Sequence, residues 1–373
     1  MKYFLSAGEA SGDLHASQLM ARLREADPSA EFSFLGGDLM AGVAGHTPVI
    51  HYRDMAYMGF VDVLLNLRKV LGNLSAAKES LAAMKPDCLI LVDYPSFNLR
   101  LARYARELGI KVFYYISPKV WAWKEYRVKE IRKLVDRMFC ILPFEPDFYR
   151  RHDYEVEYVG NPTREEMDAV KRSLPGCKEF LTSHGLPDTP YVALVPGSRV
   201  SEIKANLPVM VEALKGNTGY KPVIAAAPAI DAGLYERFAP GIPRVEGFTH
   251  QLVAYASAAL VTSGTATLET AVLGTPQVVA YRAVASRLVY NFFKHILKVK
   301  FVSLPNLIMD REIVTELLLH QCTPENLRRE LERVLPGGDR HEEQLADYAG
   351  LYRRLGTSNA SETTAAEIVK RIS

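Results

Sequence analysis

Short hydrophobic runs alternate with amphipathic stretches along most of the chain, and this alternation predicts a parallel sheet with helices between its strands. In the first part of the chain, strands are expected at residues 3–5, 32–35, 88–92, 111–116 and 137–142. The run at 88–92 is almost wholly apolar, as is typical of a parallel strand that is covered on both faces. A helix is expected to follow the first strand, from about residue 14 to residue 25.

The alternation pauses at Gly160-Asn161-Pro162 and along the polar stretch that ends near Asp188. It then restarts, with further strands expected at residues 191–195, 223–227, 258–262 and 277–281. A breaker, Pro336-Gly337-Gly338, precedes two polar helices that are expected at about 341–355 and 362–372. The pattern therefore predicts an α/β protein with two doubly wound halves.

Composition and charge narrow the class of protein. The chain has 373 residues, 48% of them hydrophobic and 24% charged, so it is expected to fold rather than remain disordered. Its net charge of +2 argues against a general nucleic-acid binder. We expect neither a signal peptide nor a membrane span, because no apolar run is long enough. The four scattered cysteines and the histidine spacings match no disulfide framework and no common metal motif, so no bound metal is expected.

In open α/β sheets ligands bind at the carboxyl ends of the strands, so we expect the functional residues in the loops that follow the apolar runs. The first loop, residues 6–13, holds Glu9 in its middle and Asp13 near the start of the helix. It matches no nucleotide-binding glycine motif. For Asp13 we favour a helix cap over a functional role. Glu9 is a candidate site residue because it lies in mid-loop at a strand end.

Asp93 directly follows the buried run at 88–92. Desolvation at that point would raise the pKa of its carboxyl toward the working range of a general base. The alternative is a structural Asp that accepts hydrogen bonds from loop amides or caps the next helix. The spacing alone favours neither interpretation.

Two loops in the second half have the composition of phosphate-binding turns. Pro196-Gly197-Ser198-Arg199 combines backbone amides with a guanidinium group that suits bidentate recognition of phosphate. The run at 262–269 opens a helix with small residues and ends at Glu269, which is placed to accept hydrogen bonds from a ribose diol. The structural alternatives are a surface turn for the first loop and a capping box that includes Glu269 for the second.

Two basic and aromatic stretches suit an anionic membrane surface. The stretch at 119–137 includes Trp121 and Trp123, and the stretch at 282–300 includes Phe292 and Phe293 at helical spacing. A third apolar stretch, at 55–71, contains Met58 and Phe60 and is either core or a rim for an acyl chain. Ordinary surface helices are the alternative for the two basic stretches.

Taken together, seven motifs resemble those of the lipid-A-disaccharide synthase family, glycosyltransferase family 19, and occur in the order typical of that family. They lie at residues 6–13, 57–64, 115–123, 142–145, 195–199, 263–269 and 302–306. The resemblance implies a GT-B fold in which two Rossmann-like domains face a central cleft. It implies an acceptor domain at 1–165, joined by C-terminal helices at 341–373, and a UDP-sugar domain at 166–340.

The resemblance also implies an activity: an inverting, metal-independent and cofactor-free transfer from UDP-2,3-diacylglucosamine to 2,3-diacylglucosamine 1-phosphate, called lipid X. The products would be the β-1,6-linked lipid A disaccharide 1-phosphate and UDP. A peripheral position at the cytoplasmic face of the inner membrane of Gram-negative bacteria is implied as well, and a homodimer is conceivable. Rival functions are another GT-B transferase such as the lipid II-forming type, a UDP-sugar 2-epimerase, and, least favoured, a non-catalytic lipid-binding protein.

The loop motifs and the family resemblance together suggest roles for individual residues. Asp93 is expected to be the general base, with Glu9 completing the site and Arg199 stabilising the departing diphosphate. The expected UDP-binding residues are Gly197, Ser198, Arg199, Ser263, Gly264, Thr265, Ala266, Glu269 and Asn306. The expected acceptor and lipid contacts are Met58, Phe60, Trp121, Trp123, Phe292 and Phe293.

Overall fold

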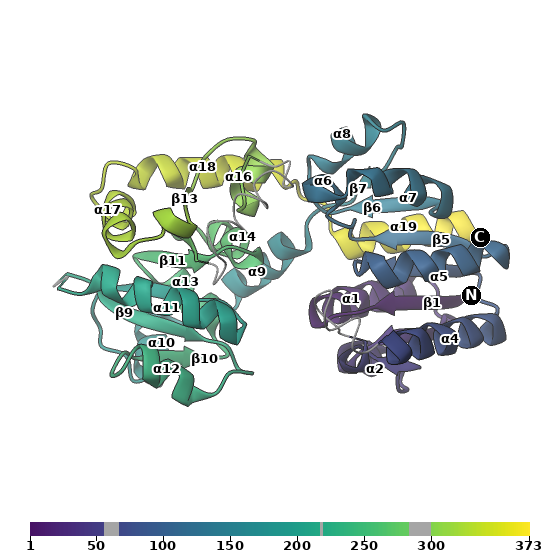
Figure 1. Ribbon diagram of the computed structural model, residues 1–373, viewed down its shortest axis with the longest axis horizontal. Coiled ribbons are helices and arrows are strands. Elements are labelled where there is room, and N and C mark those ends of the chain that lie inside the picture. The colour runs from purple at the N-terminus through teal and green to yellow at the C-terminus, as the bar shows by residue number, and fades with distance from the viewer. Residues whose placement is uncertain (56–66, 217–218, 283–299) are drawn as a thin grey trace. The chain divides into compact units, whose positions relative to one another are not determined.

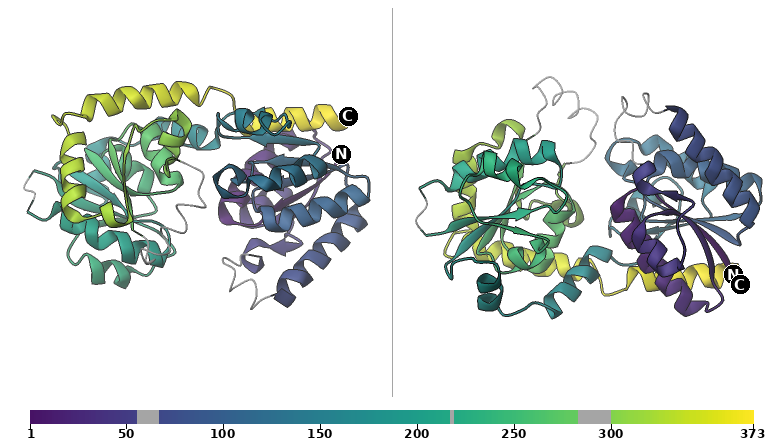
Figure 2. Two further views of the ribbon diagram at one scale, coloured as in Figure 1. Left: turned by 45° about the horizontal axis from the view of Figure 1, so that its top comes forward. Right: turned by 90° about the horizontal axis from the view of Figure 1, so that it is seen from below.

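The computed structural model describes residues 1–55, 67–216, 219–282 and 300–373, and the chain divides into two compact units (Figure 1). Unit 1 consists of Met1–Pro162 together with Thr357–Ser373, and unit 2 consists of Thr163–Gly356. Each unit contains one parallel sheet with helices on both of its faces (Figure 2). The predicted α/β class with two doubly wound halves is therefore confirmed.

The sheet of unit 1 has seven strands in the order β3-β2-β1-β4-β5-β6-β7. Their bounds are β1 Lys2–Ala7, β2 Glu31–Gly36, β3 Ile50–His51, β4 Cys88–Val92, β5 Lys111–Tyr115, β6 Arg137–Cys140 and β7 Glu157–Tyr158. The five strands predicted from apolar runs are all present. The two edge strands, β3 and β7, have only two residues each, which is too short to produce a hydrophobic pattern.

Successive residues of β4 point into the two cores of unit 1. Leu89 and Leu91 pack into one core, whereas Ile90 packs into the other. This alternation is the period-2 geometry of a strand, and it explains why β4 is apolar at every position. Both faces of the sheet must therefore be covered. Helices from two different parts of the chain cover them.

The helices of unit 1 are α1 Ala10–Ala26, α2 Asp38–Ala44, α4 Leu67–Met84, α5 Pro95–Glu107, α6 Val120–Trp123, α7 Val128–Leu134, α8 Glu145–Arg150 and α19 Ala360–Ile372. The short 3-10 helices η1 Tyr52–Asp54 and η2 Glu125–Arg127 complete it. C-terminal helix α19 packs beside α1 (Figure 2). Its Ile368 is fully buried in the same core as Leu19.

Helix α1 begins at Ala10, four residues before the predicted start, so Asp13 lies inside the helix and not at its cap. The expectation that Asp13 caps this helix is wrong. Its buried carboxylate instead accepts hydrogen bonds from the backbone amides of Gly37, Leu39 and Met40 at 2.7–3.2 Å. Asp13 therefore caps the neighbouring helix α2, whose first amides have no partner within the helix.

The sheet of unit 2 has six parallel strands in the order β10-β9-β8-β11-β12-β13. Their bounds are β8 Tyr191–Val195, β9 Lys221–Ala226, β10 Arg244–Glu246, β11 Ala258–Thr262, β12 Gln277–Tyr281 and β13 Thr315–Leu318. The helices are α9 Pro162–Arg172, α10 Cys177–Ser183, α11 Val200–Leu214, α12 Ala232–Phe238, α13 Thr249–Ala254, α14 Thr265–Leu273, α16 Leu304–Met309, α17 Pro324–Val334 and α18 His341–Arg354, with 3-10 helix η3 Leu319–Gln321.

The second boundary between the units differs from the expected one. The sequence suggested that both C-terminal helices join the first domain, but α18 belongs to unit 2 and only residues 357–373 join unit 1. Buried Gln344 of α18 exchanges hydrogen bonds with the backbone of Gln277 on β12, at 2.7 and 3.2 Å. Tyr348 accepts another from the Gln277 side chain. This buried polar network holds α18 against the second sheet.

Candidate functional site

The strand order places a switch point in unit 1 between β1 and β4, the two central strands. Consecutive strands run outward from β1 through β2, whereas β4 lies on the other side of β1. The loops after β1 and β4 therefore diverge, and such a divergence leaves a crevice at the carboxyl ends of the strands. Glu9 and Asp93 are in those two loops. The topology thus brings together two carboxylates that lie far apart in the sequence.

A pocket of about 270 Å³ contains both carboxylates. Its lining is formed by Glu9, Asp93, Pro95, Pro118, Lys119, Val120, Lys124 and Arg127. Apart from the two carboxylates, the charged residues of this lining are all cations. They come from the segment around α6 and η2, which follows strand β5. Sequence reasoning found the carboxylates but assigned this basic segment to a membrane surface.

The backbone at Asp93 is held in an uncommon conformation. Asp93 and Tyr94 both have positive φ, 43° and 48°, which costs of the order of 1–3 kcal/mol per residue. Two hydrogen bonds hold the Asp93 carbonyl in place: one from the side-chain amide of Asn98 at 2.7 Å and one from the Tyr114 hydroxyl at 2.6 Å. Because such strain concentrates at functional sites, this geometry favours a functional over a merely structural Asp93.

The environment of the Asp93 carboxyl raises its pKa above the ordinary value. Burial is the main cause, because it disfavours the charged form. The charge of Lys119 and the backbone amide of Tyr94 act in the opposite direction and do not cancel the effect. A half-buried carboxylate with a raised pKa, facing a pocket, has the properties of a general base.

Unit 2 has the same kind of switch point, between β8 and β11. The loop after β8 is the Pro-Gly-Ser-Arg turn, in which Gly197 has a φ of 111° that favours glycine. The amides of Ser198 and Arg199 donate to the Glu202 carboxylate at 3.1 and 3.3 Å, so they serve as the cap of α11. The guanidinium of Arg199 also donates to Glu202, at 2.9 Å, but its side chain is 59% exposed.

This arrangement modifies the sequence-based expectation that the turn offers its amides to phosphate. In the structure, the Glu202 carboxylate already accepts hydrogen bonds from those amides. Arg199 has five N–H donors in a planar fork, and its exposure leaves most of that fork accessible to solvent. Of this turn, the guanidinium is therefore the better candidate for binding an anion.

The loop after β11 leads into α14, whose first residues are exposed. Gly264 and Thr265 are exposed at the start of the helix, and no side chain caps it. The first amides of a helix lack partners within the helix and carry its positive dipole end. The residues predicted to bind an anion, Ser263 to Ala266, thus lie at the carboxyl end of a central strand, and their role stays a prediction.

Glu269, one turn into α14, forms a cluster with two residues from other helices. His250 of α13 lies 3.2 Å from the Glu269 carboxylate, and Glu166 of α9 adds a second negative charge nearby. Burial lowers the pKa of His250, but the hydrogen bond and charge of Glu269 outweigh burial, so the net pKa is raised. The pKa of Glu166 is raised by burial and by the charge of Glu269. No sequence signal connected His250 with Glu269.

Asn306 has a different place from the one expected of a nucleotide contact. Its side chain is fully buried and bonds to the backbone of Ile313 and Val314 and to the Glu316 carboxylate, at 2.7–2.9 Å. Glu316 in turn accepts hydrogen bonds from Val302 and Ser303. Asn306 thus positions the loop that follows residue 300, and its own amide is not presented to a ligand.

Of the predicted lipid contacts, only Trp121 has a side chain that the structure describes. Half-buried Trp121 lies in α6, where its indole N–H donates to buried Glu145 at 3.3 Å and its ring packs edge-on against Phe144. Trp121 therefore supports the segment that carries the pocket cations, although it does not itself line the pocket. Met58, Phe60, Phe292, Phe293 and the side chain of Trp123 lie outside the described residues.

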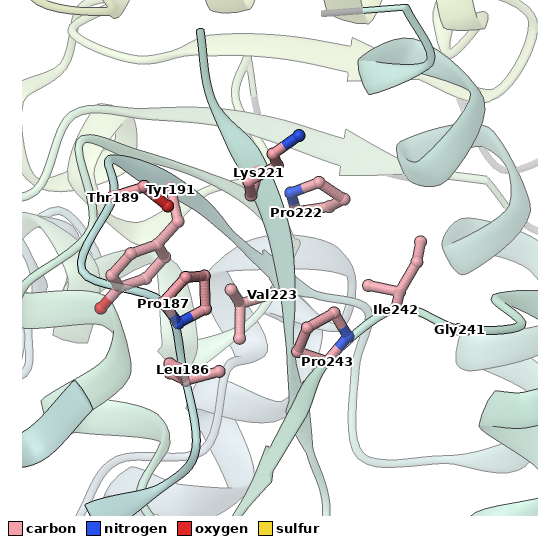
Figure 3. Close-up of a pocket in the computed structure, with 10 residues that line it drawn as sticks. All are labelled: Leu186, Pro187, Thr189, Tyr191, Lys221, Pro222, Val223, Gly241, Ile242 and Pro243. Atoms are coloured by element: carbon pink, nitrogen blue, oxygen red, sulfur yellow. The ribbon is translucent and has the colours of Figure 1, made fainter. Parts of the chain in front are cut away.

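A second cavity, of about 260 Å³, lies at the opposite end of the sheet in unit 2 (Figure 3). It is lined mainly by residues at or just before the starts of strands β8, β9 and β10, including Tyr191, Lys221 and Pro243. Apart from Lys221, its lining is mostly apolar (Figure 3). It is remote from the loops at the carboxyl ends of the strands and lacks the polar groups that a nucleotide needs.

The described residues form neither a cluster of potential metal ligands nor a helix that could cross a membrane. No group of three or more His, Cys, Asp or Glu side chains within those ranges is arranged to hold a metal ion. None of the described helices combines the length and the apolar character needed to cross a membrane.

Two doubly wound units in one chain, each with polar loops at its switch point, form the architecture of the GT-B fold. Solved structures agree on the fold. The glycosyltransferase of kitacinnamycin superposes with a TM-score of 0.66 at 14% identity, covering 100% of this chain and 99% of the other. The UDP-GlcNAc 2-epimerase of Neisseria meningitidis, solved with UDP-GlcNAc bound, gives 0.60 at 13% identity, with coverage of 100% and 99%. The fold alone thus does not separate transferases from epimerases.

Sequence comparison makes that separation. The family model described as lipid-A-disaccharide synthetase matches residues 3–369. The lipid-A-disaccharide synthase of Myxococcus xanthus is 43% identical, over 97% of this chain and 95% of the relative. That of Syntrophus aciditrophicus is 38% identical, over 96% and 94%. The chain belongs to the lipid-A-disaccharide synthetase family, and it is a glycosyltransferase of lipid A biosynthesis.

Proposed function

We propose that this chain transfers 2,3-diacylglucosamine from UDP to the 6-hydroxyl of 2,3-diacylglucosamine 1-phosphate, with inversion at the anomeric carbon. The observation that carries the assignment of residues is the pocket at the switch point of unit 1, where Asp93 and Glu9 line one cavity. Family membership supports the substrate class.

Asp93 acts as the general base in this proposal. It takes the proton of the acceptor 6-hydroxyl while that oxygen forms a bond to the anomeric carbon and the bond to the UDP oxygen breaks. The transition state has oxocarbenium character, and a single displacement inverts the configuration without a covalent intermediate. Burial raises the pKa of Asp93, so its carboxylate is a stronger base than a solvated Asp.

Unit 2 contributes the groups that bind and stabilise UDP. The exposed Arg199 guanidinium and the amides at the start of α14 are placed to stabilise the charge that develops on the diphosphate. Glu269, held by His250, is the acceptor for the ribose hydroxyls. Gly197 and Ser198 shape the turn that carries Arg199, and Asn306 holds the loop beyond residue 300.

Membrane association and assembly are further parts of the proposal. The basic, aromatic stretches at 119–137 and 282–300 suit peripheral binding to anionic lipid at the cytoplasmic face of the inner membrane, where the acylated substrates reside. The second stretch lies largely outside the described residues. Assembly into a homodimer is also part of the proposal.

The experiment that tests the function measures UDP release from UDP-2,3-diacylglucosamine with and without 2,3-diacylglucosamine 1-phosphate. The proposal predicts that UDP release depends on the acceptor and is matched by disaccharide formation. The epimerase alternative, favoured only by the shared fold, predicts a change of the UDP-sugar without acceptor. A lipid-binding protein without catalytic activity would show neither reaction.

A further inference from the structure

We propose that Lys124 and Arg127, together with Lys119, bind the phosphomonoester of the acceptor. The inference rests on the proposed function and names the group that the basic side of the pocket recognises. It also reassigns part of the stretch at 119–137, which the sequence alone assigned to a membrane surface.

The three cations reach the pocket from one short segment. Lys119 lies directly before α6 and Lys124 directly after it, and Arg127 ends η2. All three line the cavity that contains Asp93 and Glu9. The lining therefore has one positive charge more than it has carboxylates, and the two kinds of charge share a single cavity.

Two of these cations lie close enough together to repel each other. The pKa of Lys124 is lowered, first by burial and then by the positive charge of Arg127. Among the described residues, no carboxylate lies within 4 Å of the Arg127 guanidinium. A dianionic phosphate would relieve this repulsion, and the planar fork of Arg127 matches phosphate oxygens.

The acceptor carries two groups that match the cations and the carboxylates of the pocket lining. The acceptor has its phosphate on carbon 1 and its reacting hydroxyl on carbon 6, so one sugar ring separates the two groups. A phosphate bound by Lys124 and Arg127 would direct the other end of the ring toward a base in the same cavity. The cations also offset the negative charge of the phosphate, which would otherwise raise the pKa of Asp93 still further.

Other anions are less well matched to this geometry. Anionic lipid head groups suit a flat basic surface, and such a surface exists nearby, where Lys129 and Lys133 line a shallow depression with exposed Tyr126. Lys124 and Arg127 instead line the pocket that holds the candidate base. The donor diphosphate already has candidate partners in unit 2, namely Arg199 and the start of α14.

The test uses water-soluble, short-acyl acceptors with and without the 1-phosphate, so that no membrane is needed. We expect Arg127→Gln and Lys124→Gln to raise the KM for the phosphorylated acceptor roughly 10- to 100-fold, as loss of a charge-assisted hydrogen bond predicts. The KM for the dephosphorylated acceptor and the KM for the donor should stay within about twofold of wild type. Arg100→Gln, an exposed arginine on α5, is the matched control and should change none of the three.

Several results would overturn the proposal. An equal rise of KM for both acceptors, a rise for the donor alone, or lost binding to anionic vesicles with unchanged KM values would each assign these cations to another anion. Calorimetric binding of the phosphorylated acceptor without donor gives a second readout, and unchanged affinity in Arg127→Gln would also overturn it. If wild type binds the acceptor in this phosphate-dependent way but forms no disaccharide, the proposed function fails and the phosphate site stands.

Discussion

The side-chain amide of Asn98 donates a hydrogen bond of 2.7 Å to the backbone carbonyl of Asp93. The same amide group also donates to the carbonyls of Ser6 and Val92 at 3.3 Å, and the Asn98 oxygen accepts from the Ser6 hydroxyl at 2.7 Å. Asn98 is fully buried, so it joins the ends of β1 and β4 at the switch point. Together with the Tyr114 hydroxyl, this amide holds the backbone of the candidate base in place.

We therefore predict that Asn98→Ala lowers both stability and turnover. Loss of the buried amide removes its hydrogen bonds to three carbonyls and to the Ser6 hydroxyl, which costs of the order of 1–3 kcal/mol. The measurements are the free energy of unfolding in urea and kcat, with UDP affinity measured alongside. Ser96→Ala, at an exposed position of the same helix, serves as the control. Normal kcat in a folded Asn98→Ala protein would show that Asn98 does not position Asp93.

A second prediction concerns Gly8, whose missing side chain makes room for Tyr94. A Cβ at Gly8 would lie 2.3 Å from the Tyr94 ring, whose hydroxyl bonds to the Met55 carbonyl at 2.7 Å. Gly8→Ala is expected to displace Tyr94 and the adjoining Asp93, lowering kcat and the melting temperature. Gly42→Ala in α2 is the control, because its Cβ would meet nothing within 4 Å, and alanine favours helices by roughly 0.5–1 kcal/mol. If Gly8→Ala and Gly42→Ala changed kcat and the melting temperature equally, the close approach of Gly8 to Tyr94 would not be what positions Asp93.

The contact between His250 and Glu269 predicts a pH effect that is separate from catalysis. Because the pKa of His250 is raised in the folded protein, its charge stabilises the fold fully below the unfolded value of 6.5. That contribution is lost as the pH rises through the folded pKa. We expect His250→Gln to reduce the fall in stability above pH 6.5 and to weaken UDP binding roughly fivefold, about 1 kcal/mol. Tight UDP binding in His250→Gln would show that Glu269 needs no support from His250.

Glu145 predicts a pH dependence in unit 1. It is 1% exposed, and burial raises its pKa from 4.5 to about 7, although the Leu142 amide and the Trp121 indole donate to it. Its folded form thus binds a proton more tightly than the unfolded chain does. Stability should fall as the pH rises from 4.5 to 7, by up to about 3 kcal/mol.

The variant Glu145→Gln keeps an acceptor for Leu142 and removes the ionisation. We expect it to be more stable than wild type at pH 8 and to show a flatter dependence of the free energy of unfolding on pH between 4.5 and 7. A steeper or unchanged dependence would show that Glu145 is not the group responsible.

Most of the sheet framework could be predicted because its strands are buried on both faces. A run such as Cys88–Val92 is apolar at every position for that reason, so composition alone reveals it. Asp93 and Glu9 could be found because residues after such strands face the ligand-binding edge. Strands β3 and β7 could not be found, because two residues carry no periodic pattern.

Other positions depend on contacts that no sequence pattern shows. The cap formed by Asp13 requires that α1 lie beside the start of α2, 24 residues further along. The basic segment around Lys124 reads as a surface stretch until its position over the end of β4 is known. Asn306 lies in a motif that resembles a ligand-binding loop, yet its polar atoms are all used within the protein.

The most direct test of the account is the turnover of Asp93→Asn. The measurement is kcat for disaccharide formation at saturating substrates, with UDP binding followed by calorimetry on the same protein. We predict that kcat falls roughly 10²- to 10⁴-fold while UDP affinity stays within about twofold, because the amide cannot accept the proton of the acceptor hydroxyl. In wild type, kcat should fall as the pH drops through the raised pKa of Asp93. A folded Asp93→Asn enzyme with near-normal kcat would contradict the account.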